Sequence, residues 1–342
     1  METTHIAVDT SKSVFTLHAS DSTGRCTCRR DVSRGKFLAW FAKRAPLTIT
    51  LEACGGSHHW GRELAKLGHV VRLIAPQHAK PFVKRGKNDR ADAEAISEAA
   101  SRPSMRFVPV KSCQAQAQAM VLKQRALLVG QRTQLVNALR GHATEFGLVV
   151  PRGTENVGPL LAKIAAEEAM PALARELCGE LGGDIARLDE RIATIDRRIA
   201  AMHKGNPLSQ LLTTIPGIGS IAASTFATTI DPGQFQSGRA FAAYLGLTPK
   251  DHSSGGKQRL GGISRAGDER LRELLVLGAM SVLSHAVRGK PARGASAWLM
   301  KLLERKPRKV VAVALANKTA RIIWAMMSSG EVYRGAARPA AA

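Results

Sequence analysis

Alternating apolar and polar positions dominate the first hundred residues and predict strands. Residues 5–19 carry apolar side chains at period two with many β-branched residues, and a polar turn follows at 21–24, so we expect a hairpin. Short apolar runs at 47–53 and 70–75 predict two further strands, the first ending at a Gly-Gly turn and the second at Pro76.

Helical spacing appears between these strands. Phe37, Trp40 and Phe41 stand at i, i+3 and i+4 within residues 35–44, and Ser57 is a candidate N-cap for the next helix. Residues 89–100 predict a third helix. A hairpin followed by alternating helices and strands is typical of an α/β domain with a mixed sheet, which we assign to residues 1–105.

The middle of the chain, residues 106–205, is predicted to be helical. A heptad seam with spacings of 3 and 4 runs through residues 184–203, and it covers only about two heptads. A helical hairpin within one chain and a coiled coil between chains both satisfy this seam. The seam consists of Ile185, Leu188, Ile192, Ile195 and Ile199, and the candidate buried positions of the preceding helix, 113–146, are Leu122, Leu127, Leu128, Leu135 and Leu139.

Residues 206–335 predict a compact, mostly α-helical domain with glycine-rich turns, followed by a disordered tail at 336–342. The segment IPGIG resembles a helix-hairpin-helix motif, in which Gly217 and Gly219 would let the backbone approach a phosphate. A tight turn between core helices is the alternative interpretation.

The charge balance favours a polyanionic partner. The chain holds 50 Lys and Arg against 27 Asp and Glu, a formal net charge of +23, with a pI near 10.6. Its five cysteines are scattered, which argues against a disulfide framework. We find no signal-peptide pattern and no stretch of 18 apolar residues free of charge. We therefore expect a cytoplasmic, nucleoid-associated protein that binds nucleic acid and no membrane.

Four carboxylates have the placement of a metal site. Asp9 lies inside a predicted strand, where Asp is disfavoured, and Glu52 closes the next strand. Asp89 and Asp92 stand at i and i+3 near a helix start and share one face, although either alone fits an ordinary helix N-terminal acid. Together they predict binding of Mg²⁺ for phosphoryl transfer, and their order resembles that of ribonuclease H-like nucleases.

A second candidate region follows the motif YLGLTP. From composition alone, Ser253-Ser254-Gly255-Gly256 is a flexible basic loop, and His252 fits a loop residue better than a general base. A serine hydroxyl there becomes a nucleophile towards DNA phosphate if Lys257, Arg259 or a carboxylate-held metal stabilises the transition state. The residues alone leave this undecided.

Seven motifs in the same order carry a family likeness: VDTSK, LEACGG, KNDRADAEAI, IPGIG, YLGLTP, HSSGGKQRLGGISRAGDERLR and VVAVALANK. They resemble the DEDD transposases of bacterial insertion sequences, whose recombinase is guided by an element-encoded bridge RNA. The resemblance implies a ribonuclease H-like (RuvC-like) N-terminal domain, a coiled-coil middle used in assembly, and a helical C-terminal transposase domain with a helix-hairpin-helix-like motif.

The resemblance also assigns roles to residues. Asp9, Glu52, Asp89 and Asp92 match the four acidic residues expected to bind Mg²⁺, and Ser254 matches the serine expected to form a covalent link to DNA, with Ser253 as its adjacent alternative. Homodimers or homotetramers would act on double-stranded donor and target DNA with a noncoding guide RNA. Asn317 departs from the family pattern, where an arginine is common. We expect nucleic-acid contacts at Lys12, Lys87, Gly217, Gly219, Lys257, Arg259 and Arg265.

Two other functions remain open at this stage. A RuvC-like nuclease would hydrolyse DNA with water and use the rear domain only for grip. A non-enzymatic architectural protein would bind nucleic acid without cutting it, but four placed carboxylates repel phosphate unless a cation lies between them.

Overall fold

The computed structural model of the chain describes residues 3–84, 88–288 and 296–334. The chain divides into two compact units, Met1–Gln116 and Ala117–Ala342. The helical middle therefore groups with the rear domain, and the division falls at Gln116 where the sequence suggests residue 105. The tail at 336–342 lies outside the described residues.

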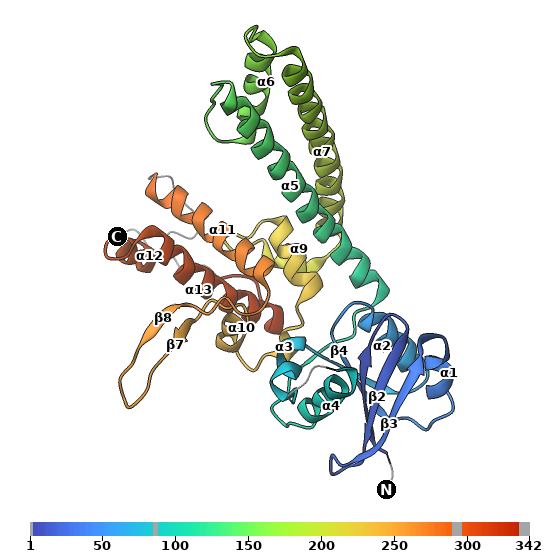
Figure 1. Cartoon of the computed structure of the whole chain (residues 1–342). Helices are drawn as coiled ribbons and strands as arrows, with labels where there is room; N and C mark the ends of the chain where they lie inside the picture. Colours follow the sequence, from blue (N-terminus) through green and yellow to red (C-terminus); the bar gives the residue numbers. More distant parts are fainter. Residues whose placement is uncertain (1–2, 85–87, 289–295, 335–342) are drawn as a thin grey trace. The chain divides into compact units, whose positions relative to one another are not determined.

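A mixed six-stranded sheet forms the first unit, in the order β3-β2-β1-β4-β5-β6 (Figure 1). β1, β4 and β5 are parallel neighbours, whereas β2, β3 and β6 pair antiparallel with the strands beside them. This confirms the predicted mixed α/β sheet. The strands are β1 (His5–Thr10), β2 (Val14–Ser20), β3 (Cys26–Ser33), β4 (Thr48–Glu52), β5 (Val70–Ile74) and β6 (Phe107–Val108).

Helices pack on both faces of this sheet, because successive strand side chains point to opposite sides. On one face, Phe15 of β2 makes edge-to-face ring contacts with Phe37 and Trp60. On the other face, Ala7 and Ile74 pack against helix α4 and its neighbour α3. The helices are α1 (Phe37–Phe41) and α2 (Ser57–Lys66) on the first face, and α3 (Pro76–Ala79) and α4 (Asp89–Ala100) on the second.

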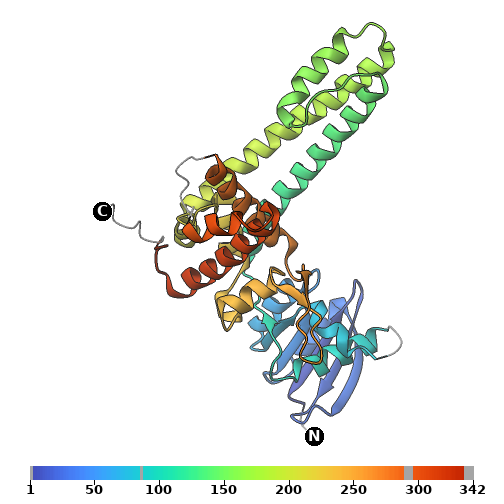
Figure 2. The ribbon, with the colours of Figure 1, turned by 90° about the vertical axis from the view of Figure 1, so that its left-hand side faces the viewer.

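A long helical hairpin opens the second unit. α5 (Cys113–Glu145) and α7 (Ala172–Lys204) run side by side, and α6 (Val157–Ala166) packs on α7 (Figure 2). Leu128 of α5 is buried in one core with four residues of the predicted seam, Leu188 to Ile199. The seam is therefore buried within one chain, which is the hairpin alternative. The prediction that Leu127 is buried is wrong, since 60% of it is exposed.

The rest of the second unit is a compact helical core with one small hairpin, which confirms the mostly helical rear that the sequence predicts. Phe226 and Phe241 are fully buried in this core. The elements are α8 (Pro207–Leu212), α9 (Ser220–Thr229), α10 (Gly238–Tyr244), β7 (Pro249–Asp251), β8 (Leu260–Ile263), α11 (Glu269–Val287), α12 (Ala297–Leu303) and α13 (Arg308–Ser329).

Helix α13 is long and apolar enough to cross a membrane by length and composition alone. Val311, Ala316 and Ile323 are nevertheless fully buried in the core of the second unit, and Lys318 and Arg321 are exposed on the same helix. This is the pattern of a core helix in a folded domain. The lack of a membrane partner stays a prediction.

Candidate functional site

Two parallel strands bring the first two carboxylates to the same place. β1 and β4 pair in register up to Val8 and Leu51, so that Asp9 and Glu52 occupy the next position on each strand. Val8 and Leu51 are buried on the α1–α2 face. Because strand side chains alternate, Asp9 and Glu52 both point to the opposite face, which α4 covers.

Helix α4 supplies the other two carboxylates. Asn88 is its N-cap, and its side chain accepts a hydrogen bond of 2.8 Å from the backbone N–H of Ala91. Asp89 and Asp92 follow in the first turn, where they also complement the helix dipole. Ligand oxygens of Asp9, Asp89 and Asp92 lie within 4.8 Å of one another. The structure thus brings together three of the four predicted acids, with Glu52 outside that radius.

The electrostatics of this cluster are those of carboxylates held too close together. The pKa of Asp9 is raised to about 6, first by burial and then by the charges of Asp89, Asp92 and Glu52, while a backbone N–H at Thr10 opposes the rise. Glu52 therefore acts on Asp9 electrostatically. A divalent cation removes this repulsion, and an all-oxygen set suits a hard cation such as Mg²⁺.

The turn after β4 fixes the chain beside this cluster. Ser57 donates a hydrogen bond to the carbonyl of Cys54, and the thiol of Cys54 lies 3.1 Å from the hydroxyl of Thr10. Gly56 has a φ of +88°, which favours glycine, and it precedes α2 as its N-cap in place of the predicted Ser57. The glycines of LEACGG are therefore explained by the turn that follows Glu52, which needs a positive φ at Gly56.

The predicted serine loop is an ordered hairpin rather than a flexible loop. β7 and β8 pair antiparallel, and Ser254 and Lys257 form a bridge at the tip. Gly255 and Gly256 between them have φ values of +55° and +74°. A two-residue hairpin turn with positive φ at both central positions is of type I′, and it requires glycine or Asn at those positions. The Gly-Gly pair is therefore explained by turn geometry.

The two adjacent serines differ in what their hydroxyls do. Ser253 donates to the carboxylate of Asp251 and accepts a 3.0 Å hydrogen bond from the backbone N–H of Arg259. For the Ser254 hydroxyl, the described part of the chain offers no hydrogen-bond partner, and the residue is exposed. The role of Ser253 in holding the hairpin was not predicted, although the Asp-x-Ser spacing is a signal for an Asx turn.

The basic residues that the sequence predicts to contact nucleic acid lie on separate elements of the two units. Lys12 is exposed in the turn between β1 and β2, and Lys257 and Arg259 are exposed on the serine hairpin. Arg265 is exposed just after β8 with a φ of +55°, an unusual value for a residue with a side chain. Lys87 lies outside the described residues.

Glycines join the two motifs that flank this hairpin. A Cβ on Gly267 would lie 1.8 Å from the carbonyl oxygen of Tyr244, and a Cβ on Gly246 would lie 2.4 Å from the backbone nitrogen of Ala266. Both glycines also have positive φ. The segments YLGLTP and SRAGD therefore pack backbone against backbone, which anchors the hairpin to the core.

The IPGIG motif has a packing role at its first glycine. Gly217 has a φ of +84°, and a Cβ there would lie 2.7 Å from the carbonyl oxygen of Gly278 in α11. Gly219 is exposed and precedes α9 as its N-cap. The tight turn between core helices is thus present, and phosphate contact at Gly217 and Gly219 stays a prediction.

Comparison with known proteins gives two matching family models. One, described as the transposase IS116/IS110/IS902 family, matches residues 209–293 and contains Ser254. The other, described as transposase and belonging to the DEDD type of IS110, matches residues 6–147 and contains Asp9, Glu52, Asp89 and Asp92. A DEDD transposase domain suggests a ribonuclease H-like fold and typically uses divalent metal ions.

Relatives matched along nearly the whole chain agree with these models. A protein of Sinorhizobium fredii named as a transposase is 53% identical over 332 residues, covering 97% of this chain and 86% of the relative. A protein of Pseudomonas aeruginosa named as a family 20 transposase is 47% identical, covering 98% and 99%. The transposase for insertion sequence element IS1111A of Coxiella burnetii is 41% identical, covering 96% and 91%. The chain therefore belongs to the IS110/IS116 family of transposases, enzymes that cut and rejoin DNA by phosphoryl transfer.

Proposed function

We propose that this transposase is an RNA-guided DNA recombinase that joins a circular element intermediate to target DNA. In this proposal the front unit is a RuvC-like domain that holds Mg²⁺, and Ser254 is the nucleophile. The observation that carries it is the convergence of Asp9, Asp89 and Asp92, whose oxygens lie within 4.8 Å of one another in a strongly basic chain.

Mg²⁺ suits this cluster because hard cations prefer carboxylate oxygens and because the acids repel one another without one. Asp9, Asp89 and Asp92 would hold the ion, with Glu52 adding charge from the neighbouring strand. When bound, Mg²⁺ supplies charge stabilisation for a phosphodiester. The protein's own contribution is to fix the acids on a strand edge and a helix start, so that little rearrangement accompanies binding.

Ser254 is favoured over Ser253 because Ser253 already uses its hydroxyl to hold the hairpin. In the proposed step the Oγ of Ser254 bonds to phosphorus, the bond from phosphorus to one sugar oxygen breaks, and that oxygen leaves as a hydroxyl with the serine proton. Attack by a sugar hydroxyl of another strand reverses the reaction and restores a phosphodiester. Bond energy is conserved, so no external energy source is required.

The partners follow from this scheme. We propose that double-stranded donor and target DNA and a noncoding guide RNA bind the basic surface, and that a homodimer or homotetramer assembles around them in the cytoplasm. The net charge of +23 supports a large polyanionic partner. Because the seam of α7 is buried against α5, we expect assembly to use other surfaces of the hairpin.

The test is to trap a covalent protein–DNA adduct. The full chain is incubated with Mg²⁺, plasmid carrying the DNA that flanks its gene, and RNA transcribed from the adjoining noncoding segment, and the products are separated under denaturing conditions. We expect an adduct with the wild type and with Ser253→Ala, and none with Ser254→Ala or Asp9→Asn. The matched serine pair controls for effects on the hairpin.

Two outcomes contradict the proposal. An adduct that persists in Ser254→Ala removes that serine as nucleophile. DNA cleavage without an adduct in the wild type indicates a RuvC-like nuclease that uses water. Omitting the RNA tests guidance separately, because an unguided transposase would form the same amount of adduct without it.

A further inference from the structure

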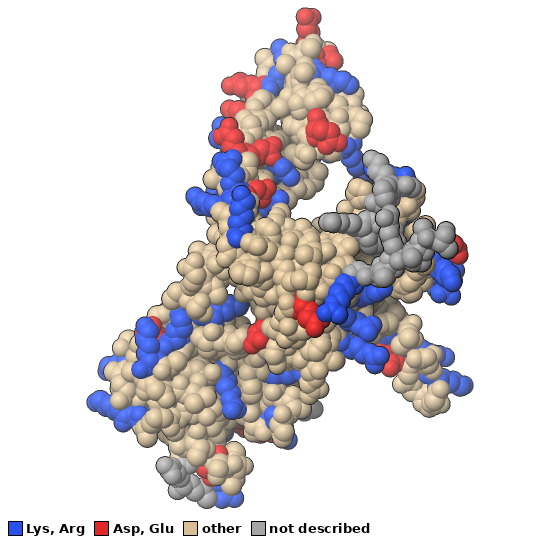
Figure 3. All heavy atoms as spheres, turned by 180° about the vertical axis from the view of Figure 1, so that it is seen from behind, with Lys and Arg blue, Asp and Glu red and all other residues tan. Residues whose placement is uncertain are grey.

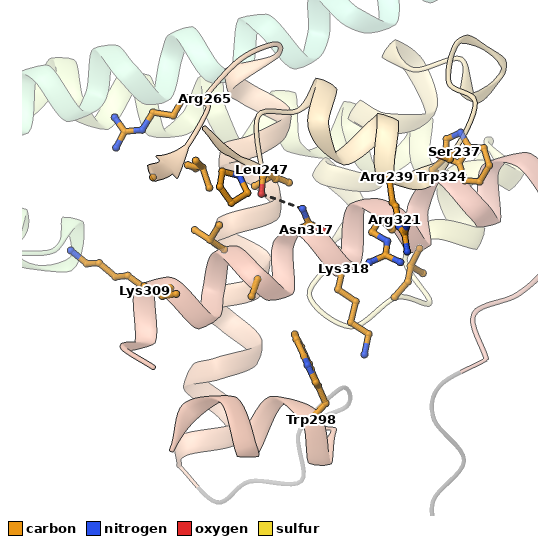
Figure 4. Close-up of a pocket in the computed structure, with 18 of the residues that line it drawn as sticks. Ser237, Arg239, Leu247, Arg265, Trp298, Lys309, Asn317, Lys318, Arg321 and Trp324 are labelled. Carbon is orange, nitrogen blue, oxygen red and sulfur yellow. Dashed lines mark hydrogen bonds between the residues drawn. The ribbon is translucent and has the colours of Figure 1, made fainter. Parts of the chain in front are cut away.

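A wide groove lies in the second unit between α13, α10, α12 and the base of the β7–β8 hairpin (Figure 4). Its volume is about 1450 Å³. Pockets for small molecules are typically about 300–1,000 Å³, so this groove has room for part of a polymer. Of its lining residues, the sequence singled out Arg265 as a nucleic-acid contact and Asn317 as a departure from the family pattern, but it did not predict the groove, because the lining comes from four separate segments.

Five cations line the groove and no acid does: Arg239, Arg265, Lys309, Lys318 and Arg321. All five side chains are exposed, and within the described ranges none has an ion-pair partner. Other arginines of the same unit are paired, as in Arg125–Asp196 and Arg132–Asp189. The unpaired positive charges of the groove therefore attract an anion, and because there are five of them they suit an anion that carries several charged groups.

Many acidic residues of this unit lie on the helical hairpin and not in the groove. Glu176, Glu180, Asp189 and Glu190 are exposed on α7, and Figure 3 shows acidic atoms concentrated on the helical hairpin while Lys and Arg are spread more widely. The charge of the groove lining itself, with five cations and no acid, favours a polyanion.

The floor of the groove is apolar, which selects the kind of polyanion. Between the cations lie Leu247, Ile263, Val310 and Val313, and Trp298 is 40% exposed at one side. A duplex presents sugar and phosphate outward and leaves an apolar floor without contacts. An unpaired strand offers both phosphates for the cations and base faces for apolar and aromatic side chains.

Trp298 has the surroundings of a stacking platform. The ammonium of Lys318 lies over the Trp298 ring, 4.7 Å from its centroid, so the lysine covers one face of the indole and a base would stack on the other, with this cation close by for its phosphate. Trp324 has a different role, since its indole N–H donates a 3.1 Å hydrogen bond to the carbonyl of Pro232 and is thereby fixed in the wall.

Two contacts keep the groove preformed. A Cβ on Gly238 would lie 3.1 Å from the backbone of Arg321, which shows that α10 and α13 pack closely where Arg239 and Arg321 project (Figure 4). Asn317 donates a 3.1 Å hydrogen bond to the carbonyl of Leu247, which joins α13 to the segment that leads into β7. Asn317, the departure from the family pattern, therefore positions the wall rather than adding a charge.

We infer that this groove binds a single-stranded segment of nucleic acid, with one unpaired base stacked on Trp298 and adjacent phosphates on Arg239, Lys318 and Arg321. The inference deepens the proposed function and rests on it for the origin of the strand. Pro249 and Ile263 of the groove belong to the hairpin that carries Ser254, so a strand bound here is anchored to the same structural element as the nucleophile. The chemistry is shared by an unpaired RNA segment and a melted DNA strand.

The test measures binding of 12-nucleotide oligouridine, oligothymidine and a 12-base-pair duplex to the full chain by fluorescence anisotropy. Trp298→Leu should weaken both single strands about fivefold or more, since that is the smallest loss expected for one stacked base, and should leave the duplex nearly unchanged. Arg239→Gln with Arg321→Gln should reduce the salt slope for single strands by about 1.4, as expected for two phosphates. A preference between oligouridine and oligothymidine identifies RNA or DNA as the source.

The matched control is Lys301→Gln with Arg305→Gln, which removes two exposed charges on and just after α12 that do not belong to the groove lining. This control should leave the single-strand salt slope unchanged. Equal loss of duplex and single-strand affinity in all variants would overturn the inference. An unchanged oligonucleotide affinity with a changed molar mass in light scattering would make the groove a protein interface.

Ser254→Ala and Asp9→Asn separate this inference from the proposed function. Both variants should bind single strands like the wild type, because neither residue lines the groove. Failure of the adduct test then leaves the groove intact as a binding site, and failure of the binding test leaves the serine mechanism intact. Melting curves by circular dichroism confirm that each variant is folded.

Discussion

The acid cluster of the first unit and the serine hairpin of the second are built on opposite principles. Asp9 is half-buried on a central strand beside other carboxylates, so its environment is costly for the charged form. Ser254 is exposed at the tip of a two-stranded hairpin whose shape comes from backbone hydrogen bonds and glycine conformations. A site that binds an ion gains from a rigid, partly dehydrated position, whereas a residue that attacks a bulky polymer gains from exposure.

The largest expected effect tests both regions at once. Asp9→Asn and Ser254→Ala should each lower strand exchange by about a thousandfold or more, as expected for a group that acts in the transition state. The double variant should be no worse than either single variant, because both act in one step. Adduct formation and recombined product measure this, and additive losses would show that the two regions act independently. RNA binding, followed by filter retention, should remain close to wild type.

Glycine substitutions test whether the rear region depends on backbone conformation. Gly267→Ala should destabilise the protein by about 3 kcal/mol or more, since it combines a positive φ with a contact of 1.8 Å to the Tyr244 carbonyl. Gly24→Ala is the matched control in the first unit, with a φ of +83° and nothing within 4 Å, and should cost about 1 kcal/mol. Denaturant unfolding measures both, and equal losses would contradict the contact argument.

The raised pKa of Asp9 makes the front region sensitive to pH. Because this pKa is about 6 without metal, a cation displaces a proton below that pH, and Mg²⁺ affinity should fall about tenfold per pH unit as the pH drops below 6. The metal-free protein should show the opposite trend, losing the contribution of protonated Asp9 to stability as the pH rises from about 4 to 6. Calorimetric titration at pH 5 and 7.5 measures the first effect, and Asp9→Asn should remove most of it. No corresponding dependence on pH is expected from the serine hairpin of the second unit.

The smallest effect separates the two serines. Ser253→Ala removes the hydrogen bonds to Asp251 and Arg259 but leaves the Ser254 hydroxyl, so adduct formation should slow about threefold through a looser hairpin. The rate of adduct formation under single-turnover conditions measures it. A loss as large as that of Ser254→Ala would assign the chemistry to Ser253.

Sequence patterns predicted the front unit well where local signals agreed with packing. Residues 89–100 form α4 as predicted, because the Asn88 cap and the apolar spacing mark the same helix. The polar turn at 21–24 implied a strand after it but gave no bounds for β3, because Cys26–Ser33 is a polar, mostly exposed edge strand without apolar alternation. The clustering of Asp9 with Asp89 and Asp92 needed the pairing of strands and the packing of α4, which no local pattern encodes.

The rear unit was harder to predict because its structure depends on contacts between distant backbones. The serine hairpin lacks apolar alternation, so only the Gly-Gly turn signal pointed to it. Leu127 and Leu128 are both apolar, yet neighbouring residues on a helix point about 100° apart, and only Leu128 faces α7. The groove around Trp298 draws on four segments and was invisible in the sequence.

The contact between Gly217 and Gly278 has a consequence for how this protein can change over generations. Each glycine excludes a side chain on the other, since a Cβ on Gly278 would lie 2.1 Å from the Gly217 carbonyl oxygen. A bulky residue at one position cannot be rescued by a smaller one opposite, because the opposite residue is already the smallest available. Single substitutions at Gly217 or Gly278 are therefore not tolerated where these two segments cross. A side chain could be accommodated at either position only if the helix axes shifted.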